Sequence, residues 1–132
     1  MSATETATER AAIEQTVQLY IDGASKGDGE QLRQAFHDSA WMYGSLAGTR
    51  YDEPISELIA LVLGQPLDSD GSYEARIASV VQVEDAATAV VEEAGCWGGI
   101  SFTNFFALAK IDGRWQIVNK TFAHTAGELP KD

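Results

Sequence analysis

The sequence contains a single cysteine, Cys96, among its 132 residues. One thiol can form neither an internal disulfide nor a cysteine-based zinc cluster, and this suits a reducing compartment. The N-terminal segment, residues 1–10, is polar and lacks the apolar core of a signal peptide. No apolar run approaches the length of a membrane span. We therefore expect a cytoplasmic protein.

Basic residues are also scarce, with nine lysines and arginines against twenty acidic residues, for a net charge of -11. Between Pro54 and Ala109 the only basic residue is Arg76. A surface of this charge repels nucleic-acid phosphates and anionic lipid, so we expect neither a nucleic acid nor a membrane as partner. The hydrophobic fraction of 45% is ordinary for a globular protein. We expect one domain over residues 1–132, with frayed ends at about 1–5 and 128–132.

The first half of the chain carries helical signals. Residues 6–9, Thr-Ala-Thr-Glu, form a capping box, and apolar residues then recur at helical spacing up to a stop at Gly27. Asp28 is the predicted N-cap of a short second helix. A third helix is expected with Pro54 in its first turn and stop signals at Gly64.

The second half changes to a period of two, which is typical of half-buried strands. Asp112-Gly113 is a strong two-residue hairpin turn. The predicted strands are a short one at 41–43, followed by a turn at Gly48, and longer ones near 73–84, 88–96, 100–111 and 114–124. Helices followed by a meander predict an α+β fold, with helices on one face of a curved, mixed or mainly antiparallel sheet.

Four motifs occur in order: Tyr-Ile-Asp-Gly at 20–23, Gly-Asp at 27–28, Ala-Phe-His at 35–37 and Asp-Gly-Arg-Trp-Gln-Ile-Val-Asn-Lys at 112–120. In this order the chain resembles the NTF2-like superfamily, which includes ketosteroid isomerase and SnoaL-like proteins. More narrowly, it is similar to the bacterial putative lumazine-binding protein family. The resemblance covers nearly the whole chain. It implies a cone-shaped, cystatin-like α+β domain with an internal pocket, and a homodimer formed through the sheet.

A pocket of this kind would bind a small, partly apolar or aromatic molecule of unknown identity. The expected ligand contacts are Tyr20, Trp41, Asn104, Phe106 and Lys120. Lys120 lies on an apolar strand face, so we expect it to pair either with a glutamate such as Glu93 or with an anionic ligand group.

The resemblance to ketosteroid isomerase implies roles for individual residues. Tyr20 matches the tyrosine that holds the enolate oxygen, and Asn104 falls near the second oxyanion donor. The catalytic base would stand at Tyr43-Gly44, where this chain has no carboxylate. Steroid-type isomerisation is therefore disfavoured.

The two histidines, His37 and His124, are the remaining candidates for a base, with Tyr20 as acid or oxyanion donor. No ligand spacing supports a metal site, and no motif indicates a cofactor, so we expect neither.

Three hypotheses follow from the sequence. In the first, a homodimer binds a small molecule without assured catalysis. In the second, the same pocket serves an isomerase or dehydratase with a histidine base. In the third, the dimer is structural, and its cone is filled by Trp97, Phe102 and Phe106.

Overall fold

Helices and strands occupy most of the chain in a computed structural model that describes residues 3–128. The elements, in order, are α1 (Ala3–Lys26), α2 (Gly29–Ala35), β1 (Phe36–Leu46), β2 (Thr49–Pro54), α3 (Ile55–Gly64), β3 (Glu74–Val83), β4 (Ala86–Cys96), β5 (Ile100–Ile111) and β6 (Arg114–Ala126). The strands form one sheet in the order β2-β1-β6-β5-β4-β3, in which only β1 and β6 are parallel neighbours among the pairs described. The predicted NTF2-like α+β cone is confirmed.

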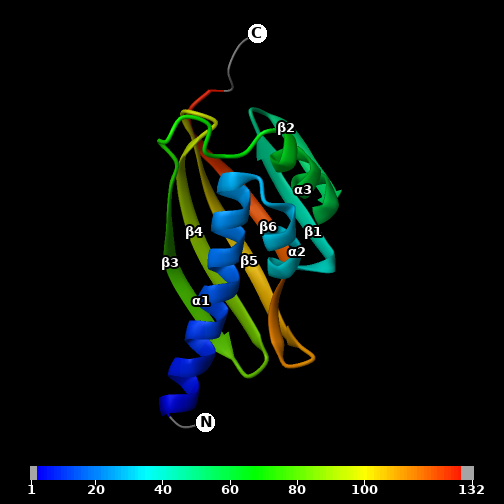
Figure 1. Ribbon diagram of the computed structural model, residues 1–132, viewed down its shortest axis with the longest axis vertical. Coiled ribbons are helices and arrows are strands. Elements are labelled where there is room, and N and C mark those ends of the chain that lie inside the picture. The colour runs from blue at the N-terminus through cyan, green and yellow to red at the C-terminus, as the bar shows by residue number, and fades with distance from the viewer. Residues whose placement is uncertain (1–2, 129–132) are drawn as a thin grey trace.

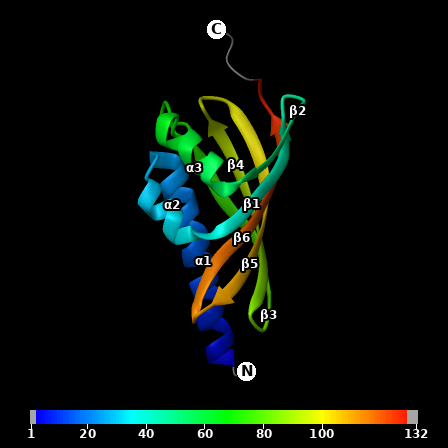
Figure 2. The same cartoon turned by 90° about the vertical axis from the view of Figure 1, so that its right-hand side faces the viewer.

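The three helices lie on one side of the sheet. In Figure 1 α1 crosses in front of β4 and β5, while α2 and α3 stand over β1. Figure 2, turned by 90°, shows the sheet curving around the helices, with no helix on its other side. The sheet therefore has a covered inner face and an outer face that no helix within residues 3–128 covers. None of the helices in this range is both long and apolar enough to cross a lipid bilayer.

The strand predictions of the second half are confirmed, with β5 at the predicted bounds of 100–111. The turn between β5 and β6 has positive φ at both residues, 51° at Asp112 and 79° at Gly113, as a tight hairpin turn of the primed type requires. The helix corner is also confirmed. Gly27 has a φ of 73°, and the Asp28 carboxylate accepts hydrogen bonds from the backbone of Glu30 and Gln31.

The first half departs from expectation in three places. Helix α1 begins at Ala3, before the predicted capping box, and β1 has eleven residues instead of three. Strand β2 was not predicted, because it lies at the sheet edge and its sequence, Thr-Arg-Tyr-Asp-Glu-Pro, contains no fully buried residue. Residues 1–2 and 129–132, which include most of the predicted frayed ends, lie outside the described residues.

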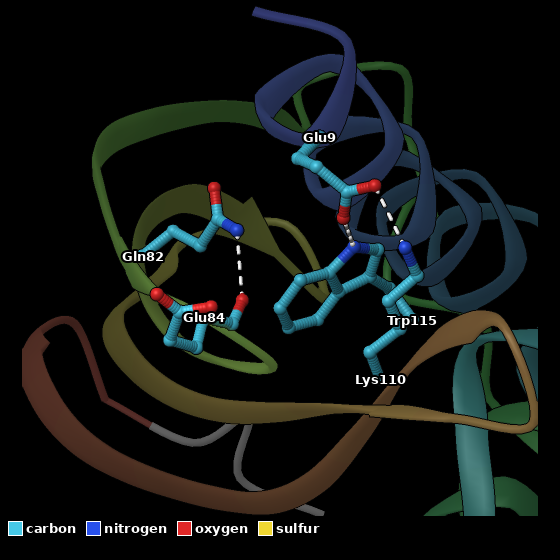
Figure 3. A network of polar contacts seen from close by, with 5 residues as sticks. All are labelled: Glu9, Gln82, Glu84, Lys110 and Trp115. Atoms are coloured by element: carbon cyan, nitrogen blue, oxygen red, sulfur yellow. Dashed lines mark hydrogen bonds and ion pairs between the residues drawn. The ribbon is translucent and has the colours of Figure 1, made fainter. Parts of the chain in front are cut away.

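Polar contacts fasten α1 to the hairpin of β5 and β6. The Glu9 carboxylate accepts hydrogen bonds from Lys110 Nζ at 2.7 Å and from Trp115 Nε1 at 2.7 Å, as Figure 3 shows. The hydrogen bond from Lys110 lowers the pKa of Glu9. Two turns further along, Thr16 Oγ1 donates to the carbonyl of Trp115 at 3.0 Å. These contacts set the position of the helix over the sheet.

Gly44 allows β1 and β6 to approach closely on the inner face of the sheet. A Cβ atom added there would lie 2.6 Å from carbons of the Phe122 ring, far inside van der Waals contact. Phe122 is itself buried and packs edge-to-face on Phe102. The site where a ketosteroid isomerase base would stand is thus occupied by an aromatic ring of β6.

We predict that Gly44→Ala lowers the free energy of unfolding by about 1–3 kcal/mol, because the new methyl group overpacks the site beside Phe122. The measurement is urea denaturation followed by circular dichroism. Gly64→Ala is the control, since a Cβ there meets no atom within 4 Å. Equal stability of the two variants would contradict this packing.

Candidate functional site

The inner face of the sheet brings polar side chains of three strands together. In the register of the sheet, Asn104 lies opposite Phe122 on one side and Val91 on the other, while Phe106 lies opposite Lys120. Alternation along β4 places Glu93 on the same face as Val91. Asn104 therefore stands diagonally between Glu93 and Lys120. All three polar residues are buried beneath the helices.

Glu93 is the centre of a hydrogen-bond network, with a relative exposure of 3%. Its carboxylate accepts from Tyr20 Oη at 3.2 Å, from Tyr73 Oη at 2.6 Å and from Asn104 Nδ2 at 2.5 Å. The donors come from α1, from the residue before β3 and from β5. A buried carboxylate is tolerated where donors replace the lost water, and these three neutral groups do so.

The two tyrosines keep their protons in this network. Burial, and then the negative charge of Glu93, raises the pKa of Tyr20 and of Tyr73 well above its ordinary value. Both phenols are therefore hydrogen-bond donors throughout the physiological pH range. A proton acceptor at this site would have to be another group.

Lys120 lies beside this network but outside its hydrogen bonds. Its side chain is buried, and within residues 3–128 its Nζ atom forms no hydrogen bond or ion pair. It is 4.5 Å from the centroid of the Phe122 ring and 6.0 Å from that of Tyr20. Burial lowers the pKa of Lys120 to about 8, although attraction to Glu93 opposes this shift.

Two adjoining hollows lie at this end of the molecule, and Lys120 lines the smaller one. The outer one, of about 630 Å³, lies between the end of α3, the β1–β2 hairpin and Trp97, whose Nε1 donates to the carbonyl of Gln65 at 2.9 Å. The inner one, of about 40 Å³, is lined by Lys120, Phe102 and Phe122. The two share three lining residues, Leu46, Tyr51 and Leu61. We call them the mouth and the inner cavity.

The structure brings four of the five expected ligand contacts together: Tyr20, Asn104, Phe106 and Lys120. Phe106 packs against the Tyr20 ring, with centroids 4.9 Å apart. Trp41 does not join them. Alternation along β1 places it on the outer face, where it is 38% exposed and its Nε1 donates to Asp52 at 2.6 Å.

The geometry also changes the roles that the resemblance implied. Tyr20 and Asn104 do converge as two donors, yet the oxygens that they reach belong to Glu93 of the chain itself. The amide oxygen of Asn104, Oδ1, is buried and has no partner within the described range.

Neither histidine contacts Tyr20. His37 Nδ1 lies 3.1 Å from the backbone nitrogen of Ser39 and 2.7 Å from its hydroxyl oxygen. His124 accepts from the backbone of Ala47 through Nδ1, and its Nε2 lies 2.7 Å from the carbonyl of Gly127, so both nitrogens have partners. Across residues 3–128, no group of three or more His, Cys, Asp or Glu side chains is placed to hold a metal ion.

Sequence reasoning treated Glu93 only as a possible partner of Lys120 and did not select Tyr73. The direct ion pair is not among the contacts of the described residues, because Glu93 is engaged by Tyr20, Tyr73 and Asn104. A signal for Glu93 was present. Residues 87, 89 and 91 are alanine, alanine and valine on the buried face of β4, and position 93 continues that face.

Comparison with known proteins agrees with this architecture. Solved structures of NTF2-like proteins match it closely. One from Shewanella baltica OS155 has a TM-score of 0.82 and 26% identity, over 96% of this chain and 99% of that one. Another from Methylobacillus flagellatus KT has a TM-score of 0.81 and 29% identity, over 96% of each chain. The fold is NTF2-like.

Residues 8–123 match the family described as "Putative lumazine-binding", and the chain belongs to that family. It is also 26% identical over 117 residues to a Cladobotryum protein named aldolase FrzH. That alignment covers 89% of this chain and 92% of the relative.

We predict that the Lys120 ammonium titrates near pH 8, measured by NMR of its side-chain amine. Glu93→Gln should move the midpoint lower, because it removes the negative charge that favours the protonated amine. Glu92→Gln, on the outer face where Glu92 pairs with Arg76, is the matched control and should leave the midpoint unchanged. An Lys120 midpoint at the ordinary lysine value would contradict the burial of this amine.

Proposed function

We propose that the protein binds a small molecule that has an apolar or aromatic body and a carbonyl group at one end. The body would lie in the mouth, against Trp97 and Tyr51, and the carbonyl would reach Lys120. The observation that carries the proposal is Lys120, whose side chain is buried and lines the inner cavity and whose amine forms no hydrogen bond or ion pair within residues 3–128. A buried amine without a partner is costly to a fold, and binding of a ligand oxygen would compensate for that cost.

Two comparisons support a ligand of this class. The family description names lumazine, a fused-ring molecule that carries carbonyl groups, and the Cladobotryum relative is named an aldolase, a class of enzyme that acts on carbonyl compounds. At 26% identity the relative supports the chemical class and does not identify the molecule.

The alternatives receive less support. A histidine base for an isomerase or dehydratase would need a free ring nitrogen in the pocket, and both nitrogens of His124 have backbone partners. The third hypothesis expects a cone filled by its own side chains. Only the small inner cavity resembles this, since about 40 Å³ is left beside Phe102, Phe122 and Lys120. The mouth, at about 630 Å³, has room for a ligand body, which favours binding.

We predict that the mouth binds 8-anilinonaphthalene-1-sulfonate, an aromatic probe whose fluorescence rises in apolar surroundings. Leu61→Trp should weaken this binding by about tenfold, because the larger side chain fills the mouth, and such a loss corresponds to about 1.4 kcal/mol. Val83→Ser, which removes an exposed apolar side chain that does not line the mouth, is the control and should leave the affinity unchanged. If Leu61→Trp has no effect, the mouth is not the binding site.

We also propose that two copies associate through the outer face of the sheet. Two adjacent rows of outward residues cross five strands and contain no charged side chain: Tyr43, Thr121, Phe105, Val90 and Ser79 in one, and Trp41, Asn119, Ala107, Thr88 and Val81 in the other. Phe105 is 51% and Val81 61% exposed. In a chain of net charge -11, an uncharged face is where two copies can approach with least repulsion.

We predict that the protein sediments as a dimer at micromolar concentration and that Phe105→Glu converts it to a monomer. The substitution places a carboxylate of each copy among the uncharged rows, where association would remove it from water. Glu92→Gln, beyond the uncharged rows, is the control and should remain dimeric. A monomeric wild-type protein would contradict this proposal.

A further inference from the structure

The chemistry of an amine changes when it is buried without a partner. A surface lysine is an ammonium ion near neutrality and has no lone pair with which to attack a carbon atom. At Lys120 burial lowers the pKa to about 8, so about a tenth of the molecules carry a neutral amine at pH 7. The carboxylate of Glu93, which would quench the amine in a direct ion pair, is instead held by Tyr20, Tyr73 and Asn104.

We propose that Lys120 forms a Schiff base with the carbonyl carbon of an aldehyde or a methyl ketone. The inference rests on the proposed function above and adds a covalent bond to it. The geometry that carries it is the position of Lys120 in the wall of the inner cavity, which adjoins the mouth at Leu46, Tyr51 and Leu61. A carbonyl carbon that enters this cavity meets the amine.

The size of the inner cavity determines the substrate class. A volume of about 40 Å³ has room for only a few water-sized groups, since roughly 10–15 Å³ of such space is enough to hold one water molecule. A formyl or acetyl end is of that size, whereas a ketone with two large substituents exceeds it. The apolar body of the substrate stays in the mouth, so the reactive carbon lies at the end of the molecule.

The atoms of the step balance without a further reactant. The nitrogen lone pair forms a bond to the carbonyl carbon, and the carbonyl oxygen leaves as water. Of the three hydrogens on the ammonium form, two leave in that water and one stays on the iminium nitrogen. The positive charge is conserved, and it remains 4.5 Å from the centre of the Phe122 ring and in the field of Glu93.

Asn104 is a further buried polar residue close to Lys120 in the sheet. It stands diagonally next to Lys120 in the sheet register, and its buried Oδ1 is without a partner within the described residues. An iminium N–H, or the hydroxyl of the intermediate before water leaves, supplies the kind of donor that this oxygen lacks.

Reductive trapping tests the proposal on the full chain. The protein is incubated at pH 7 with phenylacetaldehyde and sodium cyanoborohydride, which reduces an iminium to a stable secondary amine, and the modified lysine is located by peptide mass spectrometry. We expect Lys120 to be labelled at least about tenfold faster than Lys26 and Lys110, because burial lowers the pKa of the Lys120 amine. Leu61→Trp should remove this preference by closing the mouth, and Lys120→Met should leave only the slow labelling of the other lysines.

A parallel measurement separates this inference from the proposed function. The alcohol 2-phenylethanol has the same body and no carbonyl, so it can occupy the mouth but cannot form an iminium. Its binding is followed by ligand-observed NMR. If it binds while Lys120 is labelled no faster than Lys26, the Schiff base is wrong and the pocket stands. If neither compound binds and Lys120 is not labelled, both proposals are wrong.

Discussion

The structure depends on one buried carboxylate, that of Glu93, and on the three neutral groups that hydrogen-bond to it. A carboxylate removed from water must regain its hydrogen bonds inside the protein or destabilise the fold by several kcal/mol. Here the bonds come from Tyr20 on α1, from Tyr73 immediately before β3 and from Asn104 on β5. The network therefore ties the long helix to β4, to β5 and to the segment that leads into β3.

The same network also determines the surroundings of the Lys120 amine. Since Glu93 is held by tyrosine and amide donors, it does not need Lys120 as a direct partner, and the amine stays buried with its charge only partly compensated. Cys96, close by, is not an alternative nucleophile, because burial and the Glu93 charge raise the pKa of its thiol to about 12. Of these two groups, Lys120 is therefore the one that we propose as the nucleophile, and it lines the inner cavity beside the mouth.

Sequence reasoning reached the fold because the signals there are local. The Asp112-Gly113 turn, the Asp28 cap and the alternation along 100–111 each act through neighbouring residues, and the structure has all three. Strand β2 was not predicted, because an exposed edge strand carries no apolar pattern. Its boundaries depend on pairing with β1, which is a long-range contact that residue types alone do not encode.

Only part of the candidate site could be predicted from the sequence, because its contacts also depend on long-range pairing of strands. Tyr20, Asn104 and Lys120 were found from the resemblance and from a charge on an apolar strand face. Which donor meets which acceptor depends on the register of β4 against β5, and one residue of slip would move Glu93 to the outer face. Trp41 shows the same limit, since a single step along β1 separates the outer face from Met42 in the pocket wall.

A crystal structure of the unliganded protein near pH 7 tests the central claim most directly. The account predicts that the Glu93 carboxylate is surrounded by Tyr20, Tyr73 and Asn104, and that Lys120 Nζ faces the inner cavity without touching that carboxylate. A direct ion pair between Lys120 and Glu93, with the tyrosine hydroxyls turned elsewhere, would contradict it, because the amine would then be held in its charged form and removed from the pocket.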